Sequence, residues 1–217
     1  MKKTILEAGN QIANNINSLR FSEEEKPPMK VSPLVTIGWE TVLAEPPANN
    51  SDTTKLELEL LSKITMRRTQ SERDLVYLVD KDVKDLFFPL MRKHNLNFPA
   101  KQIEKLYYDI VHPVIMNLKW QYNRPRPYQL APKYGIQISI LKTDTHKTPA
   151  YPSGHTAYAA TFASVLAELY PKYSSDFYEL VNIAGKAREL QGVHYPSDND
   201  ASMVIASALW ENVKYNI

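Results

Sequence analysis

The chain has 217 residues, a formal net charge of +2 and no cysteine. This length suits one domain with a sizeable hydrophobic core, and the near-neutral charge argues against a nucleic-acid partner and against a polybasic membrane-binding surface. The lack of cysteine excludes disulfides, thiolate catalysis and cysteine-bound zinc.

We expect residues 1–52 to form an N-terminal helix followed by an extended, proline-rich arm that wraps the rest of the protein. The helix is predicted from apolar residues at helical spacing, which are Ile5, Ala8, Ile12, Ile16 and Leu19. Between residues 21 and 52, five prolines and a charged run break this pattern. Inside the arm, a short extended segment is predicted from Val35, Ile37, Trp39 and Val42.

The sequence begins with Met1-Lys2-Lys3, as a signal peptide could, but polar residues interrupt the apolar run that should follow. No apolar stretch reaches the roughly 18 residues that can span a bilayer. With no signal peptide, no membrane-spanning helix and no cysteine, the sequence predicts a soluble, cytoplasmic protein. The apolar N-terminal helix and the arm leave a homodimer contact open as an alternative to a monomer.

Residues 53–217 are predicted to form one all-α domain, a helical bundle. The expected helices cover residues 53–66, a stretch beginning at 71, 82–94, 99–122, 155–170, 176–191 and 197–215. The side chains expected to face the core from the first two helices are Leu56, Leu60, Leu61, Ile64, Leu75, Leu78 and Val79. Residues 123–152 hold five prolines and no sustained period, and so long a loop inside a compact domain is usually functional or disordered.

The stretch Pro152-Ser153-Gly154-His155 stands where this loop ends and the next helix begins. Glycine lets the backbone approach a ligand closely, and a helix start offers unpaired N–H groups and partial positive charge to an anion. The alternative is a serine that only caps the helix, beside a histidine with no functional role.

Two further clusters combine basic residues and a histidine with helix ends. Lys119 and Arg126 lie at the end of one predicted helix and in the loop after it, and Arg188, His194 and Asp198 lie at another helix joint. Taken alone, each cluster is explained by ordinary capping of helix ends.

The joint spacing of the three clusters resembles the signature of the type 2 phosphatidic acid phosphatase and vanadium haloperoxidase superfamily. That signature reads Lys-x6-Arg-Pro, Pro-Ser-Gly-His and Ser-Arg-x5-His-x3-Asp. The match covers roughly residues 119–198, and the flanking helices agree with the helical bundle of acid phosphatases and vanadium haloperoxidases. Ala187 stands where the signature has serine, and residues 1–52 are not explained by the resemblance.

The resemblance implies a phosphatase similar to the soluble class A acid phosphatases, acting on a small phosphate ester. His194 would attack phosphorus to form a phosphohistidine, and Asp198 would hold its other ring nitrogen. His155 would protonate the leaving oxygen and then activate water. The residues implied to bind the phosphate are Lys119, Arg126, Ser153, Gly154 and Arg188. This reading needs no cofactor and no metal ion.

Two alternatives remain open from the sequence. The same site can hold vanadate on His194, as in the haloperoxidases, which oxidise halide with hydrogen peroxide. The haloperoxidases are much longer chains, and they commonly have an aromatic residue or histidine at the position that Thr148 occupies here. A non-catalytic phosphate-binding protein would need only cations and N–H groups, so the intact set of His155, His194 and Asp198 favours an enzyme. Phosphatase is the preferred prediction.

The other residues close to the motifs, and the remaining histidines, are predicted to have no catalytic role. Arg124 is predicted to face outward or to meet the rim of the site, and Tyr151 and Tyr195 to form pocket walls. The remaining histidines, His94, His112 and His146, are assigned to structure or surface.

Overall fold

The computed structural model describes the backbone of residues 2–215 and the side chains from Asn10 to Tyr215. Within these residues the regular secondary structure is entirely helical, which confirms the all-α prediction. The α-helices are α1 (Lys2–Asn17), α2 (Trp39–Val42), α3 (Asp52–Met66), α4 (Gln70–Lys81), α5 (Phe88–Lys93), α6 (Ala100–Leu106), α7 (His112–Tyr122), α8 (Pro127–Leu130), α9 (Gly154–Leu169), α10 (Ser174–Gln191) and α11 (Pro196–Val213). No helix in the described part of the chain combines the length and apolar character needed to cross a bilayer.

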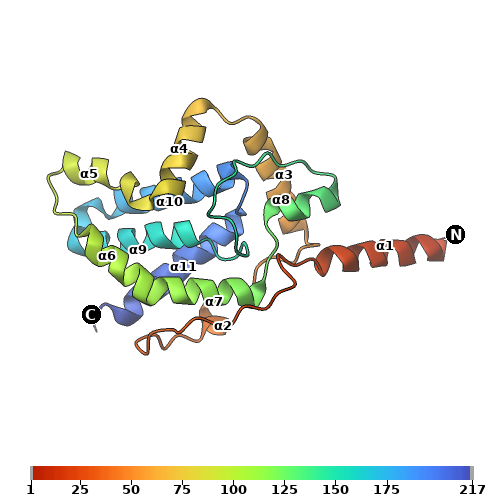
Figure 1. Ribbon diagram of the computed structural model, residues 1–217, viewed down its shortest axis with the longest axis horizontal. Coiled ribbons are helices and arrows are strands. Elements are labelled where there is room, and N and C mark those ends of the chain that lie inside the picture. The colour runs from red at the N-terminus through yellow and green to blue at the C-terminus, as the bar shows by residue number, and fades with distance from the viewer. Residues whose placement is uncertain (1, 216–217) are drawn as a thin grey trace.

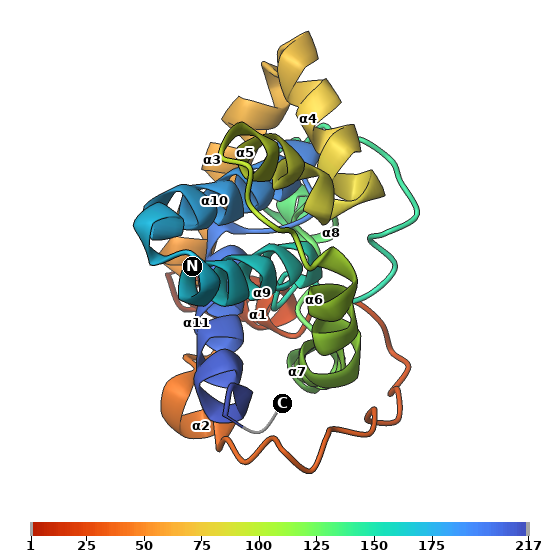
Figure 2. The same ribbon diagram turned by 90° about the vertical axis from the view of Figure 1, so that its left-hand side faces the viewer.

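Helix α9 forms the centre of the bundle, packed against α10 and α11 (Figures 1 and 2). Its sequence is apolar on almost every side, as expected of a helix that is buried all round. Small residues on it let neighbouring helices approach closely, and these are Ala157, Ala159, Ala160 and Ala163. The start of α9, which carries the Ser-Gly-His motif, is therefore held on a rigid, buried element.

Aromatic rings fill the core beside α9. Phe162 is fully buried, and its ring centroid lies 5.3 Å from that of Phe87, 5.2 Å from Tyr158 and 5.6 Å from Phe98.

We expect Phe162→Ala to lower the free energy of unfolding by about 3–5 kcal/mol, because it removes a buried ring and leaves a cavity. Urea denaturation measures this loss. Leu169→Ala, at the exposed end of the same helix, is the matched control and should change stability by less than about 0.5 kcal/mol. Equal unfolding midpoints for the two variants would contradict this account of the core.

The predicted core face of α3 is right at Leu61 and Ile64 and wrong at Leu56 and Leu60. Leu56 is 65% exposed and Leu60 is 41% exposed, whereas Leu58 and Leu61 are fully buried. The inward face also carries a buried carboxylate, Glu57, which has hydrogen-bond partners inside the protein. A pattern that counts only apolar residues cannot place a helix whose buried face includes a paired charge.

On α4 the same prediction is wrong at one position. Leu78 is exposed, and Val76 is buried with Val79 instead. The helix begins at Gln70 under a capping box made by Thr69 and Glu72, which hydrogen bond to each other's backbone N–H groups.

The predicted helix over residues 99–122 is α6 and α7 joined by a π-helical turn, Tyr107–Val111. Pro113 has no N–H to donate to the preceding turn, so the wider turn falls where the ladder of hydrogen bonds is interrupted.

Residues 123–152, predicted as a loop, contain two short helical pieces, α8 and a 3₁₀ turn at Ala131–Tyr134.

The arm runs beside α7 and α11. Asn117 on α7 hydrogen bonds to the backbone N–H and carbonyl of Met29, and Asn212 on α11 hydrogen bonds to Thr36. The predicted extended segment at residues 35–42 is partly wrong, since Trp39–Val42 forms the short helix α2.

Helix α1 projects from the bundle (Figure 1). Ile12 is 62% exposed, while Ile16 and Leu19 pack on the body. The side chains of Ile5 and Ala8 lie outside the described residues. The buried amide of Asn49 donates to the carbonyls of Ile16 and Leu19 and so fixes the end of α1 to the arm.

Candidate active site

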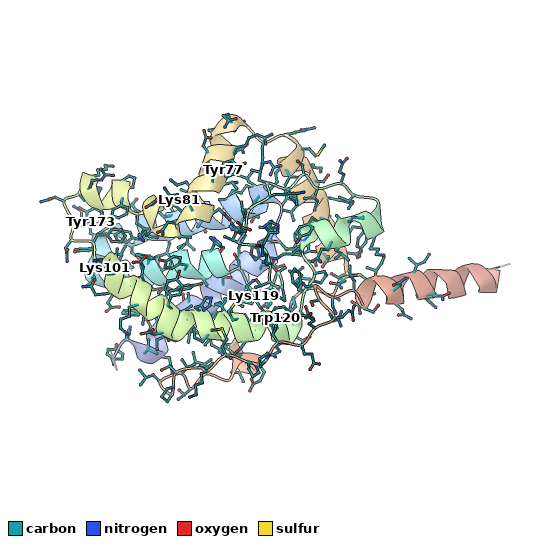
Figure 3. All side chains as sticks on the ribbon, viewed as in Figure 1. Tyr77, Lys81, Lys101, Lys119, Trp120 and Tyr173 are labelled. Carbon is teal, nitrogen blue, oxygen red and sulfur yellow. The ribbon has the colours of Figure 1, made fainter. Side chains whose placement is uncertain are left out.

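A cavity of about 480 Å³ opens between α4, the α6–α7 helix and the start of α9. Of the eight residues that the resemblance implicates, five line this cavity: Lys119, Arg126, Gly154, His155 and His194. The other three, Ser153, Arg188 and Asp198, are buried beside it. Figure 3 marks Lys81 on α4 and Lys119 on α7, two basic residues that line the cavity from different helices.

His194 is placed by the turn that joins α10 to α11. Gly192 ends α10 in the left-handed region (φ +84°), and a Cβ there would lie 2.9 Å from a side-chain carbon of Ile138. Asp198, in the first turn of α11, accepts a hydrogen bond from the backbone N–H of Tyr195 at 2.9 Å. The same carboxylate oxygen lies 3.0 Å from Nδ1 of His194. Asp198 thus caps its helix and holds the histidine.

The partners of His194 define its tautomer. A carboxylate can only accept a hydrogen bond, so Nδ1 of His194 carries the proton that points to Asp198. Nε2 lies 2.8 Å from Nη1 of Arg126, and a guanidinium can only donate. Nε2 therefore presents its lone pair. Burial, then the charges of Arg126 and Lys119, hold the pKa of His194 well below its usual value, which favours this neutral ring.

Lys119 and Arg126 are buried cations that bind the backbone around the site. Nζ of Lys119 donates to the carbonyls of Pro149 and Ala150, at 2.7 and 3.2 Å. Burial and the nearby charge of Arg126 lower the pKa of Lys119 well below its usual value. Burial and the charge of Arg188 lower the pKa of Arg126 to about 9. These lowered pKa values mean that an anion in the cavity would relieve unfavourable electrostatics.

Arg188 lies behind the cavity and is paired with an acidic residue that the motifs do not include. Its Nη1 lies 2.7 Å from Oδ1 of Asp80 on α4, and its Nη2 donates to Thr145 at 3.0 Å. Asp80 also accepts hydrogen bonds from Thr143 and Thr145. Burial alone would raise the pKa of Asp80, but the hydrogen bonds from Thr145 and Arg188 hold it below its usual value.

We expect Asp80→Asn to lower the free energy of unfolding by about 3 kcal/mol at neutral pH, because it leaves the charge of Arg188 buried without its counter-ion. The pKa of Asp80 is lowered in the folded protein, so its contribution is present above the unfolded carboxylate pKa and is lost as pH falls through the folded value. Denaturation of wild type and variant at several pH values measures this. The difference should shrink in acid, and a constant difference would contradict the pairing.

Ser153 and Gly154 occupy the N-terminus of α9. The hydroxyl of Ser153 accepts from the backbone N–H of Thr156 at 3.4 Å and contacts the hydroxyl of Thr156 at 2.9 Å. The serine is fully buried in this helix cap, whereas Gly154 lines the cavity. Tyr107 donates from its hydroxyl to the carbonyl of Gly154 at 3.1 Å, which fixes the turn against the α6–α7 helix.

His155 lies in the first turn of α9 and faces the same cavity as His194. Burial, then the charge of Arg188, holds the pKa of His155 well below its usual value, although Asp80 opposes this effect. The two histidines therefore share a cationic surrounding that a bound phosphate would neutralise.

Several neighbouring residues differ from their predicted positions. Arg124 is 2% exposed and does not face outward. Tyr151 and Tyr195 are buried in the protein rather than lining the cavity: Tyr151 donates to the carbonyl of Ala44, and Tyr195 lies against Arg124.

Of the three remaining histidines, which were predicted to be structural or on the surface, one lines the cavity and two pack on tyrosine rings. His112 lines the cavity. His94 packs on Tyr173 with ring centroids 4.4 Å apart, and His146 lies edge-on to Tyr128 at 5.8 Å. Among the described residues, no group of three or more His, Asp or Glu side chains is arranged to hold a metal ion.

A sequence model of the PAP2 superfamily matches residues 106–215, half of the chain, and this segment contains all eight motif residues. The chain belongs to the PAP2 superfamily. The resemblance noted in the sequence is thereby confirmed. Asp80, Glu57 and the helices that carry them lie outside the matched PAP2 segment.

Among characterised relatives, the non-specific acid phosphatase of Providencia stuartii is 31% identical over 114 residues, 50% of this chain and 45% of that protein. The acid phosphatase of Zymomonas mobilis is 38% identical over 89 residues, 41% of this chain and 33% of that one. The PAP2 chain described here spans less than half the length of these relatives. A transmembrane PAP2 type phosphatidylglycerolphosphate phosphatase from Bacillus subtilis is similar with a TM-score of 0.48 and 16% identity, over 76% of this chain and 86% of that one.

Proposed function

We propose that this PAP2 protein hydrolyses small phosphate monoesters through a phosphohistidine formed on Nε2 of His194. The observation that carries the proposal is the state of His194: Asp198 holds the proton on Nδ1, so the lone pair of Nε2 is available inside a cationic cavity. Named relatives with acid phosphatase activity support the same reaction class.

In the first step, a phosphate oxygen of the substrate replaces Nε2 of His194 as the acceptor of the hydrogen bond from Arg126. The lone pair of Nε2 is then free to attack. Nε2 then forms a bond to phosphorus while the bond from phosphorus to the leaving oxygen breaks. His155 gives a proton to that oxygen, so a neutral alcohol departs. Lys119, Arg126 and the N-terminus of α9 stabilise the charge on the equatorial oxygens.

In the second step, His155 accepts a proton from water as the water oxygen attacks phosphorus. The bond from phosphorus to Nε2 breaks, inorganic phosphate is released and His194 regains its lone pair. Asp198 stabilises the positively charged phosphohistidine between the two steps.

The low pKa of His155 predicts an acidic preference. The first step needs His155 protonated, and a lowered pKa means that the proton is present only in acid. We expect kcat/KM for an alkyl phosphate to fall about tenfold per pH unit above the pKa of His155 in the free enzyme. The lowered pKa of His194 in turn favours the neutral ring that the attack on phosphorus needs. A pH profile measures this, and a rate that rises steadily from about pH 5 to about pH 8 would contradict the assignment.

The proposal is tested by two assays on one purified, metal-stripped sample. One measures hydrolysis of para-nitrophenyl phosphate with and without vanadate, and the other measures bromination of a phenol dye with peroxide, bromide and vanadate. Hydrolysis that vanadate inhibits, without bromination, supports the phosphatase. Bromination that requires vanadate would replace it with a haloperoxidase, and inactivity in both assays would favour phosphate binding without turnover.

A further inference from the structure

Behind the pair of His194 and Asp198 lies a second buried ion pair that the family motifs do not include. Nη1 of Arg124 lies 2.7 Å from Oδ1 of Asp198, and Nη2 lies 3.1 Å from Oε2 of Glu57. The other oxygen of Glu57 accepts from the backbone N–H of Ser197 at 2.7 Å. The four side chains form one line of hydrogen bonds from α3 to the candidate nucleophile.

This arrangement uses both oxygens of Asp198. Oδ2 accepts from His194 and from the N–H of Tyr195, and Oδ1 accepts from Arg124. The carboxylate has no freedom to rotate without breaking one of these contacts. The direction in which Asp198 meets Nδ1 of His194 is therefore set by Arg124 as well as by the helix cap.

Arg124 is itself held on several sides. Its guanidinium carbon lies 3.8 Å from the ring centroid of Tyr195, and its Nη1 also donates to the hydroxyl of Ser197 at 2.9 Å. Its carbonyl accepts from the backbone N–H of Ala150, just before the Pro-Ser-Gly-His turn. An arginine fixed in this way is a rigid part of the site and not a mobile surface charge.

The charges explain why the pair is present. Asp198 is fully buried, and a buried carboxylate needs a charged partner. A neutral His194 cannot supply that charge, whereas Arg124 does, and Glu57 in turn offsets Arg124. With Arg124 in place, His194 can remain neutral beside a carboxylate. Without it, the nearest way to neutralise Asp198 is a second proton on the imidazole, which removes the lone pair of Nε2.

We propose that Arg124 and Glu57 are positioning residues for the nucleophile: they hold Asp198 as a fixed carboxylate and so keep His194 in the Nδ1–H tautomer with Nε2 free. The catalytic meaning of this inference rests on the proposed phosphatase function. Its structural content, the tautomer of one histidine, does not depend on turnover. Glu57 extends the site to α3, outside the segment that matches the PAP2 superfamily.

The test uses the full chain with ¹⁵N-labelled histidine, and long-range ¹H–¹⁵N spectra at about pH 7 report which ring nitrogen of His194 carries the proton. Wild type should show a protonated Nδ1 and an unprotonated Nε2. In R124M that signature should be lost, giving mixed tautomers or a doubly protonated ring. R124K keeps the positive charge but loses the two-pronged guanidinium, so it should restore part of the wild-type tautomer signature. The signature of E57Q should lie between those of wild type and R124M.

Arg68→Met is the matched control. Arg68 is also buried, but it hydrogen bonds to the backbone carbonyls of Leu190 and Ser139 and makes no contact with His194 or Asp198. We expect R68M to be less stable than wild type while its His194 spectrum is unchanged. If R124M does not fold, R124K and E57Q carry the comparison, since both keep a side chain of similar size.

Kinetics separate positioning from simple destabilisation. With para-nitrophenyl phosphate, R124M should lower kcat about 10–100-fold and change KM by less than about threefold, because Lys119 and Arg126 still bind the phosphate. An R124M variant with the wild-type histidine spectrum and the kcat of R68M would overturn the inference while leaving the phosphatase proposal intact. A wild type without hydrolysis, whose histidine spectrum still changes in R124M, would overturn the phosphatase proposal alone.

Discussion

His194→Ala is expected to lower the turnover of phosphate esters by at least about 10⁴-fold and to abolish the covalent phosphoenzyme. The reason is that Nε2 of His194 is proposed to make the bond to phosphorus, and removal of a nucleophile typically costs a factor of this size. The fold should survive, because Asp198 keeps its hydrogen bonds to Arg124 and to the N–H of Tyr195. An alkaline quench, under which phosphohistidine is stable, followed by detection of bound phosphate measures the intermediate.

The matched control for this variant is His94→Ala. His94 packs on Tyr173 and does not line the cavity, so its loss should leave both the phosphoenzyme and turnover near wild-type levels. Normal turnover by His194→Ala would remove the nucleophile assignment, whatever the control shows.

His155→Ala is expected to separate the two chemical steps. With an alkyl phosphate, whose leaving oxygen needs a proton, the rate should fall about 10²–10⁴-fold. With para-nitrophenyl phosphate the first step needs no proton, so nitrophenol should appear as a burst of about one equivalent. The second step still lacks its base, and the phosphoenzyme should accumulate.

Rapid-mixing kinetics over a series of leaving groups measures both effects. The rate of His155→Ala should depend more steeply on the pKa of the leaving alcohol than the rate of wild type does. A loss of equal size for every leaving group, with no burst, would assign His155 to substrate binding instead of proton transfer.

The helices around the motifs could be predicted because the motif residues stand at helix ends, whereas the grouping of the three clusters came from their resemblance to a family signature. His155 and Asp198 lie in the first turns of α9 and α11, and Lys119 lies in the last turn of α7. Helix ends can be recognised from capping residues, glycine and proline, so the local structure around each motif followed from local signals. The three clusters meet because α9 packs directly against α10 and α11 and also contacts α7.

Asp80 and Glu57 could not be predicted as parts of the site. Each is one of 24 acidic residues, and neither lies at a fixed spacing from a motif. Their burial depends on how α3 and α4 pack, which is tertiary information. Glu57 also explains the two wrong core positions of α3, because the helix face that contacts the site carries a charge.

Arg124 is different, because a signal was present in the sequence. Arg124 precedes Pro125 and Arg126 precedes Pro127, and a residue before proline favours extended backbone. Alternate residues of an extended segment share one side. Since Arg126 was assigned to the site, Arg124 should have been assigned to the same side, where it meets Asp198.

Helices α3 and α4 lie outside the residues that match the PAP2 superfamily, yet they carry the counter-ions of Arg124 and Arg188. Residues 106–215 are therefore not an interchangeable module. A chimaera that transplants this segment between PAP2 proteins would bring in two buried arginines whose acidic partners the new host must supply. Recombination inside this protein should succeed only at crossover points that keep α3 and α4 with the catalytic helices.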